Sequence, residues 1–69
     1  MTPAEIRTLR LNAGLTQARL AALMGLGARG QVTLSEWESG RRRISEPHAR
    51  LLTILCRQAR RQKARRKKA

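Results

Sequence analysis

The amino-acid sequence predicts an all-α protein built from four helices. Helix-start signals recur along the chain, apolar residues after them are spaced three and four positions apart, and glycines follow where helices should end. Residues 31–34 are the one stretch that resembles a short strand, but four residues beside a helical tryptophan register are weak evidence for one. A chain of 69 residues has room for a single small core, and therefore for one compact domain.

The first helix is predicted over residues 3–13 and the second over residues 17–24. Residues 2–5 match a capping box that has proline at the first helical position. Thr16 can cap the second helix with its hydroxyl. Ala21 is small enough to let a third helix approach closely. The side chains expected to face the interior are Ile6, Leu9, Arg10 and Ala13 in the first helix, and Leu20, Ala21 and Met24 in the second.

The third helix is predicted over residues 31–39, with Leu34 and Trp37 facing inward and a glycine at its end. Residues 26–30 contain two glycines and are expected to form the turn before it. A second start signal predicts a fourth helix that begins at about Pro47, and its expected apolar face comprises Leu51, Leu52 and Leu55. Two short helices joined through a glycine-containing turn have the pattern of a helix-turn-helix.

The charge of the chain predicts a polyanionic partner. Lys and Arg total 16 against 4 Asp and Glu, a formal net charge of +12, which favours nucleic acid. Residues 1–56 hold eight arginines and four glutamates, a net +4, whereas residues 57–69 hold eight basic residues and no acid, a net +8. We therefore predict a DNA-binding domain over residues 1–56 and a basic tail over residues 57–69. The tail is expected to be a frayed extension of the last helix that contacts DNA or remains in solvent, because its like charges repel.

Several other classes of protein are disfavoured by the sequence. Cys56 is the one cysteine, so no internal disulfide can form, and an intracellular protein is expected. The longest apolar run, residues 20–24, is too short to span a bilayer or to serve as a secretory signal. We find no nucleophile paired with a base, no phosphate-binding glycine loop and no metal-ligand cluster. We expect a soluble protein that is not an enzyme and that uses no metal, cofactor, small-molecule substrate or membrane.

The motifs of the chain resemble those of a known family. The chain is similar to the phage Cro/repressor family of helix-turn-helix regulators, also called Xre-type, in the segments Gly14-Leu15-Thr16-Gln17, Leu20-Ala21, Met24-Gly25-Leu26 and Trp37-Glu38-Ser39-Gly40. The resemblance covers residues 5–55. It implies a compact, lambda-repressor-like domain that binds operator DNA as a homodimer and regulates transcription, in the cytoplasm and nucleoid of a bacterial cell or phage-infected host.

Two features depart from the family pattern. The turn after Gly25 is longer than usual, and residues 28–30 are the expected insertion. The family often adds an apolar fifth helix for dimerisation, whereas this chain has only a basic tail there. The apolar residues left over after the predicted core is filled are candidates either for a dimer contact or for partial burial: Ile44, Leu11, Leu23 and Ile54.

The start of the third helix supplies the candidate base-reading residues. Gln31 can bond to adenine and Arg29 to guanine in the major groove. Val32 is a candidate for contact with a thymine methyl group, or else a minor core residue. Thr33 can contact a phosphate or a thymine methyl group, or cap the helix. Glu36 lies on the outer face, where a carboxylate can accept a hydrogen bond from cytosine, disfavour wrong partners by its charge near the phosphates, or simply remain solvated.

Other residues are expected to hold the phosphate backbone or the fold. Gln17 resembles the family's backbone clamp at the start of the second helix, and Arg41, Arg42 and Arg43 follow the third helix, where they can run along the phosphates or form a solvated loop. The resemblance implies that Arg10 and Glu38 form a partly buried ion pair. The expected environments of three further residues are the core for Trp37, the surface of the last helix for His48, and a small apolar or half-exposed helix position for Cys56.

A sequence-specific repressor of double-stranded DNA, from a phage or mobile element, is the leading hypothesis, and the resemblance rather than the composition suggests it. One alternative is a sequence-tolerant basic protein that coats or bridges nucleic acid. Another is an antitoxin-like module whose helix surface binds a protein. Binding to selected and random DNA at several salt concentrations separates the first two, and a nuclease-resistant protein complex would support the third.

Overall fold

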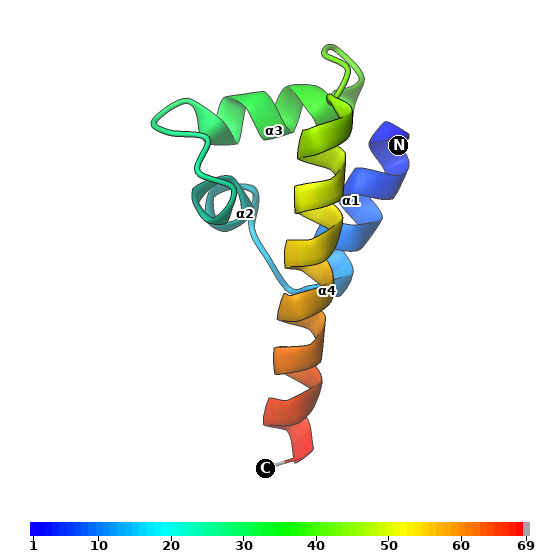
Figure 1. Ribbon diagram of the computed structural model, residues 1–69, viewed down its shortest axis with the longest axis vertical. Coiled ribbons are helices and arrows are strands. Elements are labelled where there is room, and N and C mark those ends of the chain that lie inside the picture. The colour runs from blue at the N-terminus through cyan, green and yellow to red at the C-terminus, as the bar shows by residue number, and fades with distance from the viewer. Residues whose placement is uncertain (69) are drawn as a thin grey trace.

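The structure, a computed structural model, describes the backbone of residues 1–68 and the side chains of residues 1–64. It contains four helices in chain order, α1 (Pro3–Asn12), α2 (Gln17–Leu23), α3 (Gly30–Ser39) and α4 (Glu46–Lys68). The predicted all-α fold is confirmed, and no strand occurs over residues 1–68. Figure 1 shows α3 across one end of the 40 Å long axis, α1 beside the first half of α4, and the second half of α4 projecting from the opposite end.

Capping groups start α1 and α2 as predicted. The Thr2 side chain accepts a hydrogen bond from the Glu5 backbone N–H at 3.1 Å, and the Glu5 carboxylate accepts one from the Thr2 N–H at 2.9 Å. These two bonds hold the pKa of the Glu5 carboxyl below its ordinary value. The Thr16 hydroxyl accepts from the Arg19 N–H at 3.0 Å. Each helix ends one residue before its predicted boundary, because Ala13 and Met24 are C-caps.

The turn between α2 and α3 contains two glycines in the left-handed region, Gly25 (φ 70°) and Gly27 (φ 81°). Gly30 belongs to α3 and is buried, so the turn ends one residue earlier than predicted and the third helix starts at residue 30 rather than 31. A Cβ atom added to Gly30 would lie 2.9 Å from the Cβ atoms of Ala21 and Leu26. The small Ala21 therefore permits the close helix approach that was predicted, and it does so together with Gly30.

The core lies where the four helices meet. Its fully buried members are Ile6, Leu20, Leu34, Leu52 and Cys56, and Ala13, Met24, Trp37 and Ile44 complete it. The apolar face predicted for α4 is wrong at Leu51, which is 37% exposed, and it omits Cys56, which is 2% exposed. The buried side of α4 instead follows the four-residue spacing from Leu52 to Cys56.

The tail prediction is corrected in one respect. The basic segment does not fray, since α4 continues as a helix to Lys68. The segment lacks Gly and Pro and is rich in strong helix formers, and half-buried Ala59 still packs against the core. The side chains of residues 65–69, which belong to the predicted tail, lie outside the described residues. Among the described helices, none combines the length and the apolar character that a membrane span requires.

Candidate nucleic-acid interface

The outer face of α3 is polar because the helix buries its opposite side. Gly30, Leu34 and Trp37 face the core. Helical periodicity then turns Gln31, Val32 and the residues one turn further along toward solvent, where Val32 is 53% exposed. An isoleucine- or leucine-rich outer face would be expected if α3 were a buried helix on all sides. The amphipathic pattern therefore leaves one helix face free to meet a partner.

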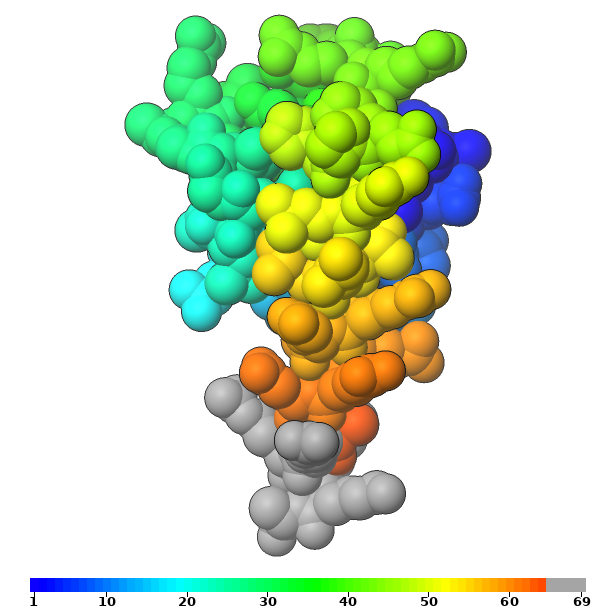
Figure 2. Space-filling view, viewed as in Figure 1, coloured from blue at the N-terminus to red at the C-terminus, as the bar shows by residue number. Residues whose placement is uncertain are grey.

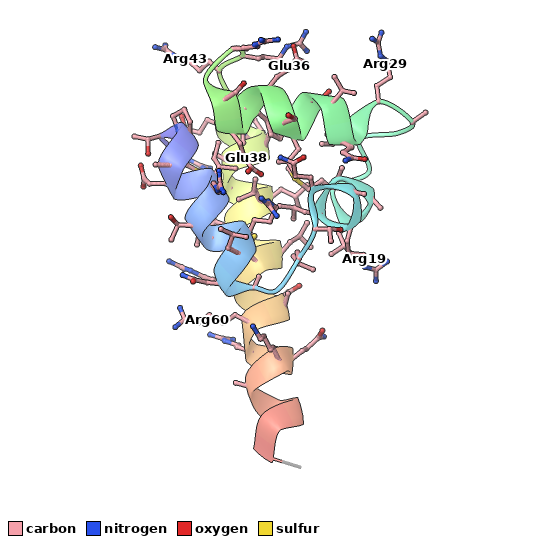
Figure 3. All side chains as sticks on the ribbon, turned by 180° about the vertical axis from the view of Figure 1, so that it is seen from behind. Arg19, Arg29, Glu36, Glu38, Arg43 and Arg60 are labelled. Atoms are coloured by element: carbon pink, nitrogen blue, oxygen red, sulfur yellow. The ribbon has the colours of Figure 1, made fainter. Side chains whose placement is uncertain are left out.

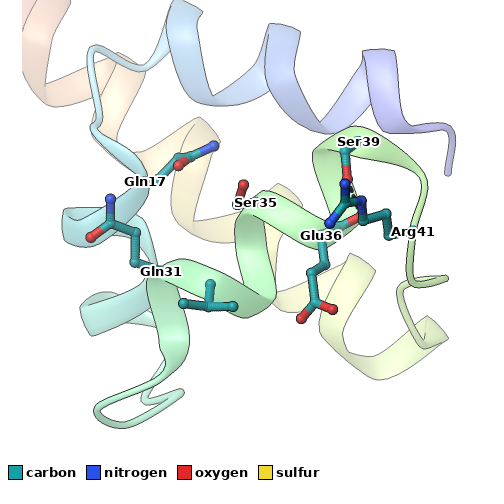
Figure 4. Close-up of a pocket in the computed structure, with 7 residues that line it drawn as sticks. Gln17, Gln31, Ser35, Glu36, Ser39 and Arg41 are labelled. Atoms are coloured by element: carbon teal, nitrogen blue, oxygen red, sulfur yellow. Dashed lines mark hydrogen bonds between the residues drawn. The ribbon is translucent and has the colours of Figure 1, made fainter.

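A shallow hollow runs along one side of this face (Figure 4). It is lined by the first residue of α2, by α3 and by the loop that follows α3: Gln17, Gln31, Val32, Ser35, Glu36, Ser39 and Arg41. The amide side chains of Gln17 and Gln31 lie at one end of the hollow, and Glu36 and Arg41 lie at the other. The structure thus brings five of the predicted site residues together from three segments of the chain.

A second hollow lies on the other side of Val32 and Glu36. Arg29, Thr33 and Arg42 line it together with those two residues. The Arg29 side chain is exposed, so its guanidinium can meet a ligand. Figure 3 shows Arg29 and Glu36 directed outward from the same end of the molecule, with Arg43 beside them.

The arginine loop is tied to the end of α3. The backbone N–H of Arg42 and the hydroxyl of Ser39 both donate to the Glu36 carbonyl oxygen, at 3.3 and 3.1 Å. Arg41, Arg42 and Arg43 all remain exposed. Arg43 does not join the two hollows beside α3, because it lines a third one near the start of α1.

Sequence reasoning missed Ser35 and Ser39. Both line the first hollow, at four and eight residues after Gln31. The spacing of Leu34 and Trp37 already defined the outer face and could have identified them. A serine hydroxyl is less specific for one base than glutamine or arginine, so the chemistry of these two residues alone does not single them out.

An ion pair fixes α3 on α1. Arg10 Nε donates to Glu38 Oε2 at 2.7 Å and Arg10 Nη2 donates to Glu38 Oε1 at 3.1 Å, while Nη1 bonds to the Leu15 carbonyl oxygen at 3.0 Å. The two side chains are only 11% and 7% exposed. The structure therefore contains the pair that the family resemblance implied, and its paired geometry satisfies two charges at the edge of the core.

The remaining side chains with chemical potential have structural environments. Trp37 is 3% exposed and packs 5.3 Å, between ring centroids, from His48, which is half-buried rather than on the surface as predicted. Burial raises the pKa of the Cys56 thiol, and the nearby positive charge of Arg10 opposes this shift. Within the described residues, no three His, Cys, Asp or Glu side chains gather as a metal site.

A helix-turn-helix with a polar outer face and adjacent arginines defines a class of proteins that place the second helix of the motif in the major groove of DNA. The family described as helix-turn-helix matches residues 6–56 of this chain. The chain belongs to this family of Cro/C1-type helix-turn-helix proteins, as the sequence motifs predicted. It is accordingly a DNA-binding transcription regulator. No curated protein and no solved structure matched the chain.

Proposed function

We propose that this protein is a transcriptional repressor that reads a palindromic operator as a homodimer in the cytoplasm of a bacterial cell or phage-infected host. The observation that supports it most directly is the polar outer face of α3, which lies beside the first residue of α2 and the arginine loop. A repressor of this kind acts by occupying its site, so it needs specific DNA contacts and no catalytic group.

Recognition is proposed to use two kinds of contact, one to base edges and one to phosphates. Gln31 and Arg29 are proposed to read base edges, with Val32 and Thr33 against thymine methyl groups or phosphates and Glu36 able to accept from cytosine. The phosphate contacts, which set position rather than sequence, are assigned to Gln17 at the start of α2 and to Arg41, Arg42 and Arg43. Ser35 and Ser39 add hydroxyl groups to the same surface.

Selection of bound sequences from a random DNA pool tests this proposal. We expect one preferred sequence with two-fold symmetry and half-sites about 10 base pairs apart. Arg29→Ala or Gln31→Ala should cost ~1–3 kcal/mol on that sequence and flatten the preference at one base pair. Arg41→Ala is the matched control, since loss of a phosphate contact should weaken all sequences alike. Equal weakening by all three variants would contradict base reading, and a pool that yields no preferred sequence would contradict the operator.

The dimer surface is assigned to a groove between α1 and the first half of α4. Exposed Met1 and Ile54 line it together with Glu5, Glu46 and Arg50. Glu46 and Arg50 pair at 3.3 Å but remain 78% and 77% exposed, so both can meet a partner. In a two-fold contact the same patch meets itself, which lets acids of one copy face the arginine of the other. The groove holds both acids and an arginine, so it is complementary to itself, and this favours a second copy as the occupant although the chain as a whole is strongly basic.

Sedimentation of two arginine variants tests this surface. Ile54→Arg should give a monomer, because it places a charge in the groove. Leu11→Arg is the matched control, since Leu11 is 52% exposed against 53% for Ile54 but does not line the groove. Equal association of both variants would contradict the surface, and a monomeric wild-type chain on DNA would contradict the homodimer. Ile44, one of the predicted contact residues, is only 8% exposed and belongs to the core.

A further inference from the structure

The acidic and basic side chains are distributed unequally along the molecule. Glu36 and Glu38 lie on α3, and Glu5 and Glu46 lie in the first turns of α1 and α4. These first turns are close to the α3 end, since residues from the start of α1 line one hollow with the arginine loop and another with the start of α4. All four acids of the chain are therefore outside the second half of α4.

The charged residues in the second half of α4, residues 57–68, are all basic, and this segment points away from α3. Its described charged side chains are all exposed: Arg57, Arg60, Arg61 and Lys63. Figure 2 shows the described part of the segment, in orange, at the opposite side of the body from α3, and Figure 3 places Arg60 far from Arg29, Glu36 and Arg43. No residue of the chain after Glu46 is acidic.

This basic segment is held in place where it leaves the core. Cys56 is fully buried, and one turn later Arg60 and Lys63 line a hollow with Asn12 at the end of α1. The Lys63 side chain lies 3.5 Å from the position that a Cβ atom would take on Gly14. A cation near the C-terminal end of α1 is also favoured by the helix dipole. The first basic residues are thus part of a defined surface.

A duplex bound by α3 is out of reach of these charges. The described basic residues lie 11 to 17 positions after the start of α4, about 16–26 Å along the helix axis away from the α3 end, and the interaction between exposed charges is screened over about 10 Å at 0.1 M salt. Lying along the same DNA, which was one sequence-based expectation for the tail, is therefore disfavoured for a straight α4.

We propose that the exposed basic residues of the second half of α4 form a second, sequence-independent binding site for double-stranded DNA, through which the protein bridges two duplex segments. This goes beyond the proposed operator binding, which one duplex satisfies. The site consists of long, flexible Arg and Lys side chains that can contact successive phosphates of a DNA backbone. Single-stranded nucleic acid fits it less well, because stacking platforms need aromatic side chains and the one aromatic residue, Trp37, is buried in the core.

A two-duplex capture experiment with the full chain tests the proposal. A biotinylated random-sequence duplex is immobilised, the protein is added, and capture of a second, fluorescent random-sequence duplex is measured between 50 and 200 mM salt. Arg60→Gln/Arg61→Gln removes two charges while keeping good helix formers. Arg7→Gln/Arg19→Gln is the matched control, because it removes the same charge from exposed positions on α1 and α2. Fluorescence anisotropy with one duplex is measured in parallel.

The wild-type chain should bind one duplex and capture the second. Arg60→Gln/Arg61→Gln should reduce capture and lower the salt dependence of capture by about 1.8 in log–log slope, since each phosphate contact contributes about 0.9. The control should capture as the wild type does. Undiminished capture by the α4 variant, as two α3 surfaces of a dimer would give, overturns the proposal. The proposal is also overturned if the immobilised complex captures single-stranded RNA but not a second duplex.

The two proposals fail in different ways. Wild-type protein that binds one duplex but captures no second one overturns the bridging site and leaves operator binding intact. A chain that binds neither duplex overturns both proposals. A circular dichroism spectrum of each variant checks that loss of capture is not loss of folding, and a misfolded double variant is replaced by Arg57→Gln/Arg61→Gln, for which the same outcomes apply.

Discussion

Gly30 occupies the point where the start of α3 packs directly on α2. Its helical conformation does not require glycine, and alanine would ordinarily favour the helix by about 1 kcal/mol. Its surroundings do require glycine, because a Cβ atom would stand 2.9 Å from those of Ala21 and Leu26. A residue that the sequence marks as part of a flexible turn is therefore a packing residue.

Gly30→Ala is expected to destabilise the protein despite the higher helix propensity of alanine. Overpacking typically costs ~1–3 kcal/mol, which outweighs the propensity gain, and a net loss of about 1 kcal/mol should lower Tm by roughly 4–8 °C in a domain of this size. Thermal unfolding followed by circular dichroism measures the change. Ala21→Gly in the same background should recover part of the loss. A raised Tm in the single variant would contradict the prediction, because it would show that neighbouring atoms shift to accommodate the added methyl group at little cost.

Cys56 is expected to make the free energy of unfolding depend on pH in the alkaline range. Burial raises its thiol pKa above the ordinary value of 9.0, so the unfolded chain loses the proton at a lower pH than the folded chain. The contribution of Cys56 to stability is therefore fully present below pH 9 and is lost as pH rises above 9, by at most about 1.4 kcal/mol per pH unit. Urea unfolding at pH 7 and pH 10 should show this loss in the wild type, and Cys56→Ala should lack that part of it. An identical pH dependence in both proteins would contradict the assignment.

At the scale of helices, most of the fold could be predicted from local signals. The capping residues Thr2 and Thr16 and the spacing of apolar residues placed all four helices within about one residue of their observed starts. The errors arose where tertiary contacts decide. Ile44 was not assigned to the core because it lies in a loop, where no helical period fixes which side faces inward. Cys56 was missed because the adjacent Leu51 and Leu55 suggested another face, although its four-residue spacing from Leu52 places it on the buried side.

The candidate site could be predicted in its chemistry but not in its full extent. The position of Gln31 on the outer face follows from Leu34 and Trp37 alone, and so does that of Glu36. That Gln17 shares a hollow with Gln31 depends on how α2 packs on α3, which is set by Gly30. The direction of the basic segment could not be foreseen, because it depends on α4 continuing as a straight helix out of the core.

The Arg10–Glu38 ion pair joins α1 to α3 and should be a major determinant of how the reading helix is held. Loss of one partner leaves the other nearly buried and unpaired, so Glu38→Ala or Arg10→Ala should destabilise by ~3–5 kcal/mol. Glu38→Gln should cost less, since an amide oxygen still accepts from the guanidinium. Chemical denaturation measures all three variants, and unchanged unfolding midpoints in both alanine variants would refute a structural role for the pair.

At the scale of the whole molecule, the same net charge acts in opposite directions on the two proposed associations. Attraction of a +12 chain to DNA weakens with salt, because binding releases counterions from the phosphates. Association of two such chains is opposed by their mutual repulsion, which salt screens. The dimer groove, which holds two of the four acids, reduces this repulsion locally without cancelling it.

Salt should therefore strengthen the dimer in the absence of DNA. Two net charges of +12 held about 24 Å apart, the intermediate extent of the molecule, repel by roughly 2 kcal/mol at 0.1 M salt and negligibly at 1 M. Self-association should accordingly tighten by about 30-fold over that range, while DNA affinity falls. Sedimentation equilibrium at both salt concentrations measures the first effect and anisotropy with a DNA duplex the second. A dimer that dissociates as salt rises would mean that interchain ion pairs, such as Glu46 with Arg50, dominate over the repulsion between the two chains.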